Sequence, residues 1–409
     1  MSLVLPPQVA ALRCVLCGFT HRDPWLWTCP HCGPESRMDV LYDADAPARM
    51  ARELAAAPLD HWRYRAVMPI PEGAALPPLQ VGWSPVHEAP RLAARLGLAR
   101  VVVKDDGRNP SASLKDRASS VGVVMAVAAG KERITCASTG NAASSTACIA
   151  ASMGLAATIF VPRRAPLPKI AQLRVFGAQV FRVDADYDTA WDLAAAVAAR
   201  KPWFNRNCAI NPYLVEGKKT VGLELAEQLG ARMTPWVAIS VGDGCTIAGL
   251  IKGLEEAHAA GLIPFVPRVL GVQAEGAAPL VHAFERGDGP QTEAASTVAD
   301  SLCVGHPRNG HKALQAIRRN GGVLLAVPDA AILAALATLA ESTGIFGEPA
   351  ASATVAGVAA ARARGILGEE DEVAVVVTGN GLKDPGSVLE AVAGPVDVAP
   401  SVDAVLAAL

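Results

Sequence analysis

Two pairs of cysteines near the N-terminus have the spacing of a metal site. Cys14 and Cys17 form one CxxC knuckle, and Cys29 and Cys32 form another after a gap of eleven residues. Four thiolates at this spacing can close a tetrahedral zinc site, and four protein ligands leave no open position for catalysis. We therefore expect a zinc ribbon over residues 1–45 whose Zn2+ is structural. A ribbon that has lost its metal and a redox-active CxxC are the alternatives.

A lysine lies where a helix is expected to begin. The segment NPSASLKDR at 109–117 offers Ser111 and Ser113 as capping residues for a helix that starts near Lys115. A lysine at the positive end of a helix is electrostatically unfavourable, so its pKa is expected to fall. A lowered pKa supplies the neutral amine that a Schiff base with a carbonyl compound requires. By itself, the segment also fits an ordinary helix start on the surface.

A second polar loop offers a place for an anion. Residues 137–144 read ASTGNAAS and join an expected strand to an expected helix. The hydroxyls of Ser138 and Thr139, together with the first backbone N–H groups of the helix, suit a carboxylate. The amide of Asn141 could donate to a phenolate-like oxygen. Taken alone, the loop is better explained as a simple capped helix start.

A glycine-rich loop, GDGCT at 242–246, has the same strand-to-helix context. Gly242 and Gly244 let the backbone approach a ligand closely, Thr246 adds a hydroxyl, and the helix N-terminus favours phosphate. The loop does not read GxGxxG and lacks the GK[ST] ending of a P-loop, which disfavours a dinucleotide or ATP. Asp243 is unexpected, because a carboxylate repels a phosphate unless it points away.

A fourth loop, TGNGLKDP at 378–385, ends the last strong apolar run. The hydroxyl of Thr378 could pair with a ring nitrogen, and a simple turn at a strand end is the alternative. All four loops follow expected strands. Because ligands of open α/β sheets bind at the carboxyl ends of strands, we expect a single site between two lobes.

These loops belong to a regular alternation of short Val- and Ile-rich runs with helical segments. The alternation predicts an α/β fold of two doubly wound lobes with mainly parallel sheets. Irregular stretches at 71–85 and 205–217 suggest a large lobe from 46–108 and 205–409 and a smaller lobe from 109–204. Strands are expected at 99–104, 133–136, 157–161, 179–183, 236–241, 269–273, 323–327 and 373–377.

The composition is that of a soluble globular protein. Of 409 residues, 51% are hydrophobic and 19% are charged, and the net charge is −2. Acidic and basic residues are interspersed, so we expect no nucleic-acid partner. The first residues do not resemble a signal peptide, and no apolar run is long enough to cross a bilayer. The nine cysteines argue against a secreted disulfide framework, and we expect a cytoplasmic protein with no membrane partner.

The order of the loops resembles the fold type II family of pyridoxal 5'-phosphate (PLP) enzymes and, within it, the threonine synthases. NPxxSxKDR, STGN, a glycine-rich phosphate loop and TGNGLKDP stand in that order, together with NPYLVEGKKT at 211–220 and EPA at 348–350. The resemblance covers about residues 62–385, and similar members also carry an N-terminal zinc ribbon. It implies a carbon–oxygen lyase, a small amino-acid substrate and a homodimer.

The resemblance implies a role for each loop. Lys115 would hold PLP covalently and move protons at the substrate Cα, and Thr378 would face the pyridine nitrogen. A neutral hydroxyl partner leaves that nitrogen unprotonated, which suits elimination and replacement chemistry. The substrate would be bound by Ser113, Ser138, Thr139 and Asn141, of which the last three would also reach the 3' oxygen of the cofactor. The phosphate of PLP would be held by Gly242, Asp243, Gly244, Cys245 and Thr246, and Asn141 and Thr378 would complete the cofactor site.

Two departures from the family pattern bear on the substrate. Some members have an arginine two residues before the Glu of the EGxKT motif, where it grips the substrate phosphate; this chain has Leu214. Ala209 stands where a hydroxyl is often found. Losing a bidentate phosphate ligand is not a conservative change. Either Arg163, Arg164 or Lys218 takes over, or the substrate is not O-phosphohomoserine.

Three hypotheses follow. The leading one is a threonine synthase-like lyase that converts O-phosphohomoserine and water to threonine and phosphate. Leu214 motivates a second, elimination or replacement on another amino acid, as in a serine or threonine dehydratase or a synthase that uses O-phosphoserine, such as cysteate synthase. The third is an inactive binding protein with a PLP fold, and the intact Lys115, Asn141 and Thr378 argue against it.

Overall fold

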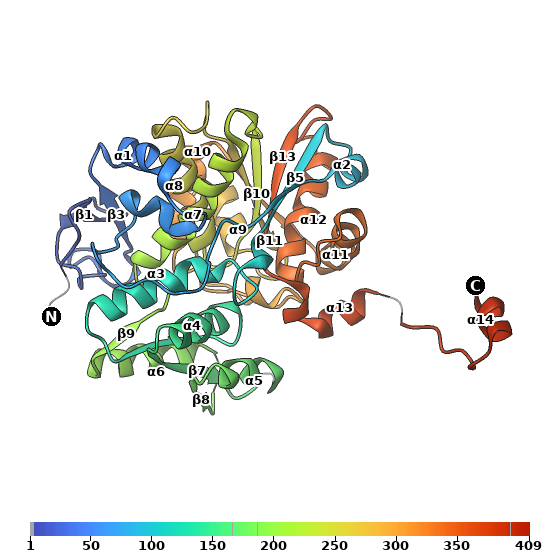
Figure 1. Ribbon diagram of the computed structural model, residues 1–409, viewed down its shortest axis with the longest axis horizontal. Helices are drawn as coiled ribbons and strands as arrows, with labels where there is room; N and C mark the ends of the chain where they lie inside the picture. Colours follow the sequence, from blue (N-terminus) through green and yellow to red (C-terminus); the bar gives the residue numbers. More distant parts are fainter. Residues whose placement is uncertain (1–3, 166, 186, 393) are drawn as a thin grey trace.

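The N-terminal residues form a small antiparallel sheet at one end of the molecule (Figure 1). The computed structural model describes residues 4–409 except 166, 186 and 393. Strands β1 (Val9–Cys14), β2 (Thr20–His21) and β3 (Met38–Tyr42) are arranged in the order β2-β1-β3. This sheet carries the two cysteine knuckles.

A six-stranded sheet in the order β12-β11-β10-β13-β5-β4 forms the centre of the molecule. Its neighbouring strands are parallel, except that β4 runs antiparallel to β5. Along β10, Val237 and Ile239 pack into one core and Ala238 into another, so the sheet is covered by helices on both faces. The strands are β4 (Val86–Glu88), β5 (Arg100–Asp105), β10 (Trp236–Ser240), β11 (Arg268–Ala274), β12 (Val323–Val327) and β13 (Glu372–Val377).

The order of these strands joins two loops that are far apart in the sequence. Strand β5 pairs with β13 in parallel, so the loops that follow them leave the same edge of the sheet. The backbone N–H of Leu114 donates to the carbonyl of Thr378 at 2.9 Å, and Ser113 forms a bridge with Gly379. The lysine loop and the TGNGLKDP loop are therefore one structural unit.

A four-stranded parallel sheet in the order β8-β7-β6-β9 lies beside the large one. It consists of β6 (Arg133–Ala137), β7 (Ala156–Pro162), β8 (Gln179–Val183) and β9 (Trp203–Asn205). Two sheets of mainly parallel strands confirm the predicted fold class. The division into lobes at 46–108, 109–204 and 205–409 stays a prediction.

Close helix packing beneath the sheets depends on glycine. A Cβ atom on Gly217 of α7 would lie 2.1 Å from the carbonyl oxygen of Arg117 on α3, and one on Gly253 of α8 would lie 2.1 Å from that of Lys219 on α7. Only glycine lets these three helices approach so closely. The helices are α1 (Ala46–Glu53), α2 (Pro90–Leu96), α3 (Lys115–Ala128), α4 (Asn141–Ser152), α5 (Leu167–Val175), α6 (Tyr187–Arg200), α7 (Tyr213–Leu229), α8 (Cys245–Ala259), α9 (Pro279–Arg286), α10 (Gly310–Asn320), α11 (Asp329–Thr343), α12 (Pro349–Ala363), α13 (Pro385–Ala391) and α14 (Val402–Ala408).

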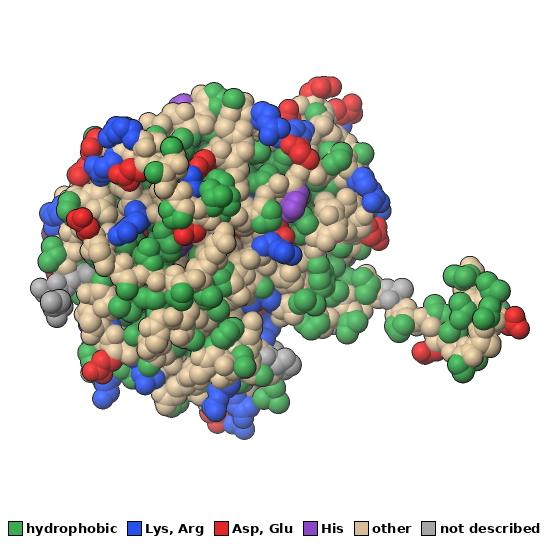
Figure 2. Space-filling view, viewed as in Figure 1, with side chains coloured by type: hydrophobic (Ala, Val, Ile, Leu, Met, Phe, Trp, Pro, Cys, Tyr) green, Lys and Arg blue, Asp and Glu red, His purple; other side chains and the backbone are tan. Residues whose placement is uncertain are grey.

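The C-terminal helix α14 stands apart from the body of the protein (Figure 1). Figure 2 shows a largely apolar surface on it, and Val402 and Leu406 are 74% and 63% exposed. In the part of the chain that the structure describes, no helix is long and apolar enough to cross a membrane.

The predicted strands at 179–183 and 323–327 are confirmed to the residue. One prediction was wrong: the stretch 205–217 is not irregular throughout, because α7 begins at Tyr213. Pro212 precedes the first helical residue, where its lack of an N–H costs nothing, and so it starts this helix rather than preventing it. The short strands β4 and β9 were not predicted, since three residues carry too little pattern.

Candidate active site

Lys115 is the first residue of α3 and lines a cavity of about 680 Å3. Burial lowers the pKa of its amine, and the positive charge of nearby Lys218 lowers it further. The direction of this shift agrees with the prediction, but its causes here are burial and a neighbouring cation, not the helix terminus that was expected to lower the pKa.

The predicted serine caps of α3 were wrong. Leu114 occupies the N-cap position with helical angles, and no side chain caps the helix there. The Ser111 hydroxyl instead donates to the carboxylate of Asp116 at 2.6 Å, and the buried hydroxyl of Ser113 has no partner among the described residues. The loop is closed by Asp116, which reaches back from the first helical turn.

A buried ion cluster fixes the lysine loop from behind. Arg117 donates to both oxygens of Asp106 at 2.7 Å and also pairs with Glu224, and all three side chains are fully buried. Burial alone would raise the pKa of Asp106, but the charges of Arg117 and Lys104 and the hydrogen bonds from Arg117 and Ser84 together hold that pKa below its usual value. Since Asp106 follows β5 and Arg117 lies on α3, the cluster ties both ends of the loop that presents Lys115.

The cavity brings together most of the predicted site. Side chains from both sheets converge on it, which confirms that the four loops meet at one place. Ser113, Gly244 and Cys245 lie outside its lining. The predicted residues that do line it are Lys115, Ser138, Thr139, Asn141, Gly242, Asp243, Thr246 and Thr378.

The GDGCT loop begins helix α8 and leaves room only for glycine. Gly244 has φ +91°, and a Cβ atom on it would lie 2.7 Å from Cβ of Ala313. The carboxylate of Asp243 accepts the backbone N–H of Cys245 at 3.0 Å, so it is engaged within its own loop. Burial would raise the pKa of Asp243, but the charges of Lys218 and Lys115 and the hydrogen bonds from Cys245 together lower that pKa. This pairing of an acid with nearby positive charge explains how a carboxylate can stand in a phosphate loop.

The STGN loop is linked to the opposite wall of the cavity. The amide of Asn141 donates to the carboxylate of Glu348 at 2.7 Å and to the hydroxyl of Ser301 at 3.4 Å. Burial raises the pKa of Glu348. The Ser138 hydroxyl accepts the backbone N–H of Gly140 at 3.2 Å. Asn141 is thus oriented by Glu348, a partner that sequence reasoning did not assign.

Sequence reasoning missed part of the inner wall. Arg206, Asn207 and Cys208 follow β9 and line the cavity beside Lys218. The pKa of Cys208 is held well below its usual value, because it accepts a hydrogen bond from Cys245 and lies near Lys218 and Arg206. They stand at the carboxyl end of a strand like the four recognised loops, but the sequence signal for that strand was too weak to use, because β9 is only three residues long.

Comparison with known proteins gives the family. A profile described as "Pyridoxal-phosphate dependent enzyme" matches residues 78–379. The chain belongs to this family. It is 34% identical to the threonine synthase of Methanosarcina acetivorans over 402 residues, which cover 97% of this chain and 98% of that one. It is likewise 34% identical to the threonine synthase of Methanocaldococcus jannaschii, over 94% of this chain and 96% of that one.

A solved structure shares the fold of this PLP-dependent enzyme. The processed form of threonine deaminase isoform 2 from Solanum lycopersicum superposes with a TM-score of 0.66 and 21% identity, covering 86% of this chain and 95% of that one. The predicted fold type II enzyme that resembles threonine synthase is therefore confirmed.

The residues of the cavity fit PLP. The Lys115 amine, with its lowered pKa, is suited to covalent attachment, and Thr378 offers a neutral hydroxyl. The GDGCT loop is a cradle that side chains would fill, since a Cβ atom on Gly242 would lie 3.1 Å from the carbonyl oxygen of Ser301. The start of α8 adds the positive end of a helix for a phosphate.

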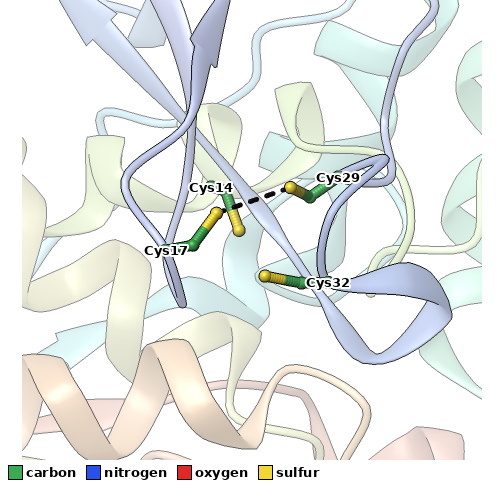
Figure 3. Close-up of side chains that lie close together, drawn as sticks. All are labelled: Cys14, Cys17, Cys29 and Cys32. Carbon is green, nitrogen blue, oxygen red and sulfur yellow. Dashed lines mark hydrogen bonds between the residues drawn. The ribbon is translucent and has the colours of Figure 1, made fainter.

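The four N-terminal cysteines form a compact group of ligands (Figure 3). Their sulfur atoms all lie within 4.8 Å of one another, and those of Cys17 and Cys29 are 3.6 Å apart. Zn–S bonds of about 2.3 Å in a tetrahedron place sulfurs about 3.8 Å apart, so the group fits a metal ion. Gly18 and Gly33 follow the knuckles with φ +79° and +73°, which closes each turn.

Proposed function

We propose that this PLP-dependent enzyme converts O-phosphohomoserine and water to threonine and phosphate. The observation that carries the proposal is a cluster of cations in the cavity lining, where Lys218 lies near both Lys115 and Arg206. A substrate with both a carboxylate and a phosphate ester matches such a cluster. The similarity to threonine synthases over nearly the whole chain supports the same assignment.

The side chains suggest a division of tasks. PLP, held by Lys115 and the GDGCT loop, would supply an electron sink for the substrate Cα. The Lys115 amine, because its pKa is lowered, can remove a proton at Cα and later return one. Ser138 and Thr139, at the start of α4, suit the substrate carboxylate, and Glu348 holds Asn141 in position beside them.

Leu214 supports a second candidate. It is fully buried and absent from the cavity lining, so its position provides no phosphate ligand. The second candidate is elimination or replacement on another amino acid, such as serine or threonine dehydration or a reaction of O-phosphoserine.

Phosphate release by the PLP-loaded protein tests both candidates. O-phosphohomoserine and O-phosphoserine are supplied in parallel, with serine and threonine as phosphate-free substrates, and each organic product is identified. Phosphate and threonine in equal amounts from phosphohomoserine alone are expected. Pyruvate or 2-oxobutanoate without phosphate release would establish dehydration instead.

We also propose that the four cysteines hold a structural Zn2+. Asp39 on β3 accepts from Lys252 of α8 at 3.1 Å and from Lys312 of α10 at 2.6 Å, so the ribbon is tied to the catalytic core. Elemental analysis should find one zinc per chain, lost in a Cys14→Ser/Cys29→Ser variant. A folded wild-type protein that binds no metal would contradict the proposal. The homodimer and the cytoplasmic location stay predictions.

A further inference from the structure

Two buried cations at the inner wall of the cavity have no carboxylate partner. Lys218 and Arg206 are 2% and 1% exposed, and in the described part of the chain neither has a carboxylate oxygen within 4.0 Å. In contrast, Lys219 pairs with Glu216 at 2.8 Å in the same helix. The charge of the two cations is offset mainly by the Cys208 thiol and, for Lys218, by the more distant carboxylate of Asp243. Because a buried charge without an ion pair is costly, an anionic ligand at this wall would stabilise the two cations further.

The side chain of Arg206 is held in a fixed direction. Its Nε and Nη2 atoms donate to the hydroxyl of Ser119 at 3.2 and 3.0 Å, and Nη1 donates to the sulfur of Cys208 at 3.3 Å. Ser119 follows Lys115 by one turn of α3, so both lie on the same face of that helix. The guanidinium is therefore directed to the side of the cavity on which Lys115 lies.

Asn207 adds a buried donor to the same wall. Its Oδ1 atom accepts the backbone N–H of Ala137 at 3.2 Å, while Nδ2 has no partner among the described residues. The side chain is 4% exposed and lines the cavity. A buried amide with a free N–H is costly unless a ligand accepts from it.

Arg206 and Leu214 lie side by side against α3. A Cβ atom on Gly122 would lie 2.8 Å from Cδ2 of Leu214 and 3.8 Å from Cγ of Arg206. An arginine at position 214, which the family pattern predicts, would therefore have its side-chain base beside the same part of α3 that the aliphatic part of Arg206 contacts. Leu214 fills this patch with an apolar side chain, and the positive charge comes from position 206 instead.

We propose that Arg206, Lys218 and Asn207 form a phosphate subsite that binds the ester phosphate of the substrate, an inference that rests on the proposed function. The location favours the substrate over the cofactor as the source of this phosphate. Arg206 and Asn207 follow β9, and Asn207 is bonded to Ala137 at the start of the STGN loop, which is the substrate side. The cofactor phosphate has its own cradle at α8, on the other sheet.

The test uses the PLP-loaded protein and inorganic phosphate as the probe. Arg206→Gln is expected to raise both the Kd of phosphate, measured by titration calorimetry, and the KM of O-phosphohomoserine by about 10- to 100-fold, the loss typical of a charged hydrogen-bonding partner. The PLP content per chain should not change. Arg206→Lys should give an intermediate effect, since lysine keeps the positive charge but lacks the planar guanidinium that can donate two parallel hydrogen bonds. Arg163→Gln is the matched control, because Arg163 pairs with Asp184 at the surface and lies outside the cavity lining.

A double variant that moves the positive charge from position 206 to position 214 tests whether a loss of binding in the single variant comes from misfolding. Arg206→Leu should lose phosphate binding, and Arg206→Leu/Leu214→Arg should regain part of it, since both side chains start beside Gly122. A Kd unchanged in Arg206→Gln overturns the proposal, and so does a loss of PLP in step with phosphate, which would assign the anion to the cofactor. If the wild type binds phosphate through Arg206 yet releases none from phosphohomoserine, the subsite stands and the proposed function fails.

Discussion

Two groups of buried cations differ in whether a carboxylate lies within ion-pair distance. Behind the lysine loop, Arg117 is enclosed by Asp106 and Glu224, so the positive charge is matched within the protein. At the cavity wall, Lys218 and Arg206 are as deeply buried, yet no carboxylate in the described chain lies within ion-pair distance of either. The matched group is complete without a ligand, whereas the unmatched one is completed by an anion.

This difference in charge pairing distinguishes residues that hold the site in shape from residues that bind the ligand. A matched cluster fixes a loop whatever is bound, because removing either partner leaves a buried charge. Cations that have no carboxylate at ion-pair distance gain a further counter-charge when an anionic ligand binds, and this binding stabilises the folded protein.

Replacing Lys115 should have the largest effect on activity. Lys115→Ala removes the amine that attaches the cofactor and moves the proton, so phosphate release from phosphohomoserine should fall by at least about 10³-fold. The control is Lys201→Ala at an exposed lysine. Thermal unfolding should show that Lys115→Ala is folded. Activity above a tenth of wild type would exclude Lys115 from catalysis.

Breaking the matched cluster should have the largest effect on stability. Arg117→Met leaves the buried Asp106 without its ion pair and Glu224 with only Lys104, at 3.5 Å, and should lower the free energy of unfolding by about 3–5 kcal/mol. Lys218→Met removes a cation with no carboxylate at ion-pair distance and should lower the free energy of unfolding by less than Arg117→Met does, because Asp243 loses only a more distant positive charge. Both are measured by urea unfolding after removal of the cofactor. Equal losses would mean that the two groups do not differ as described.

Two cysteines of the same cavity should alkylate at different pH. The pKa of Cys208 is lowered by its bond from Cys245 and by Lys218 and Arg206, whereas burial raises the pKa of Cys136 to about 11. Because the thiolate reacts, Cys208 should be alkylated at pH 7 and slow down only as the pH falls below its pKa. Cys136 should accelerate as the pH rises toward 11.

The same experiment sharpens the role of Arg206. Arg206→Met should raise the pKa of Cys208 and slow its alkylation at pH 7, by about tenfold for a shift of one pKa unit. Peptide mass spectrometry follows each cysteine separately, with Cys148, whose pKa burial raises to about 11, as an internal reference. Identical pH midpoints for Cys208 and Cys136 would show that the cavity cations do not act on the thiol.

The recognised loops and the missed ones differ in how local their signal is. The STGN and GDGCT loops can be identified as anion-binding loops from the sequence, because glycine, hydroxyl residues and the start of a helix lie within a few positions of one another. Arg206 has no such context, since the strand before it is only three residues long. Its role comes from Ser119 on α3, which is remote in sequence and adjacent in space. The predicted serine caps were wrong for a different, local reason, because the Ser111 hydroxyl donates to Asp116 five residues later.

The longer strands, the helices between them, the two cysteine knuckles and Lys115 could be identified from the sequence alone, because backbone propensities and turn chemistry act over short distances. Which loops meet and which charges are matched depends on the tertiary structure. The pairing of β5 with β13 joins Leu114 to Thr378, and the burial of Arg206 beside Lys218 sets the charge of the cavity. These outcomes depend on the strand order and on desolvation, which are properties of the packed chain rather than of any segment.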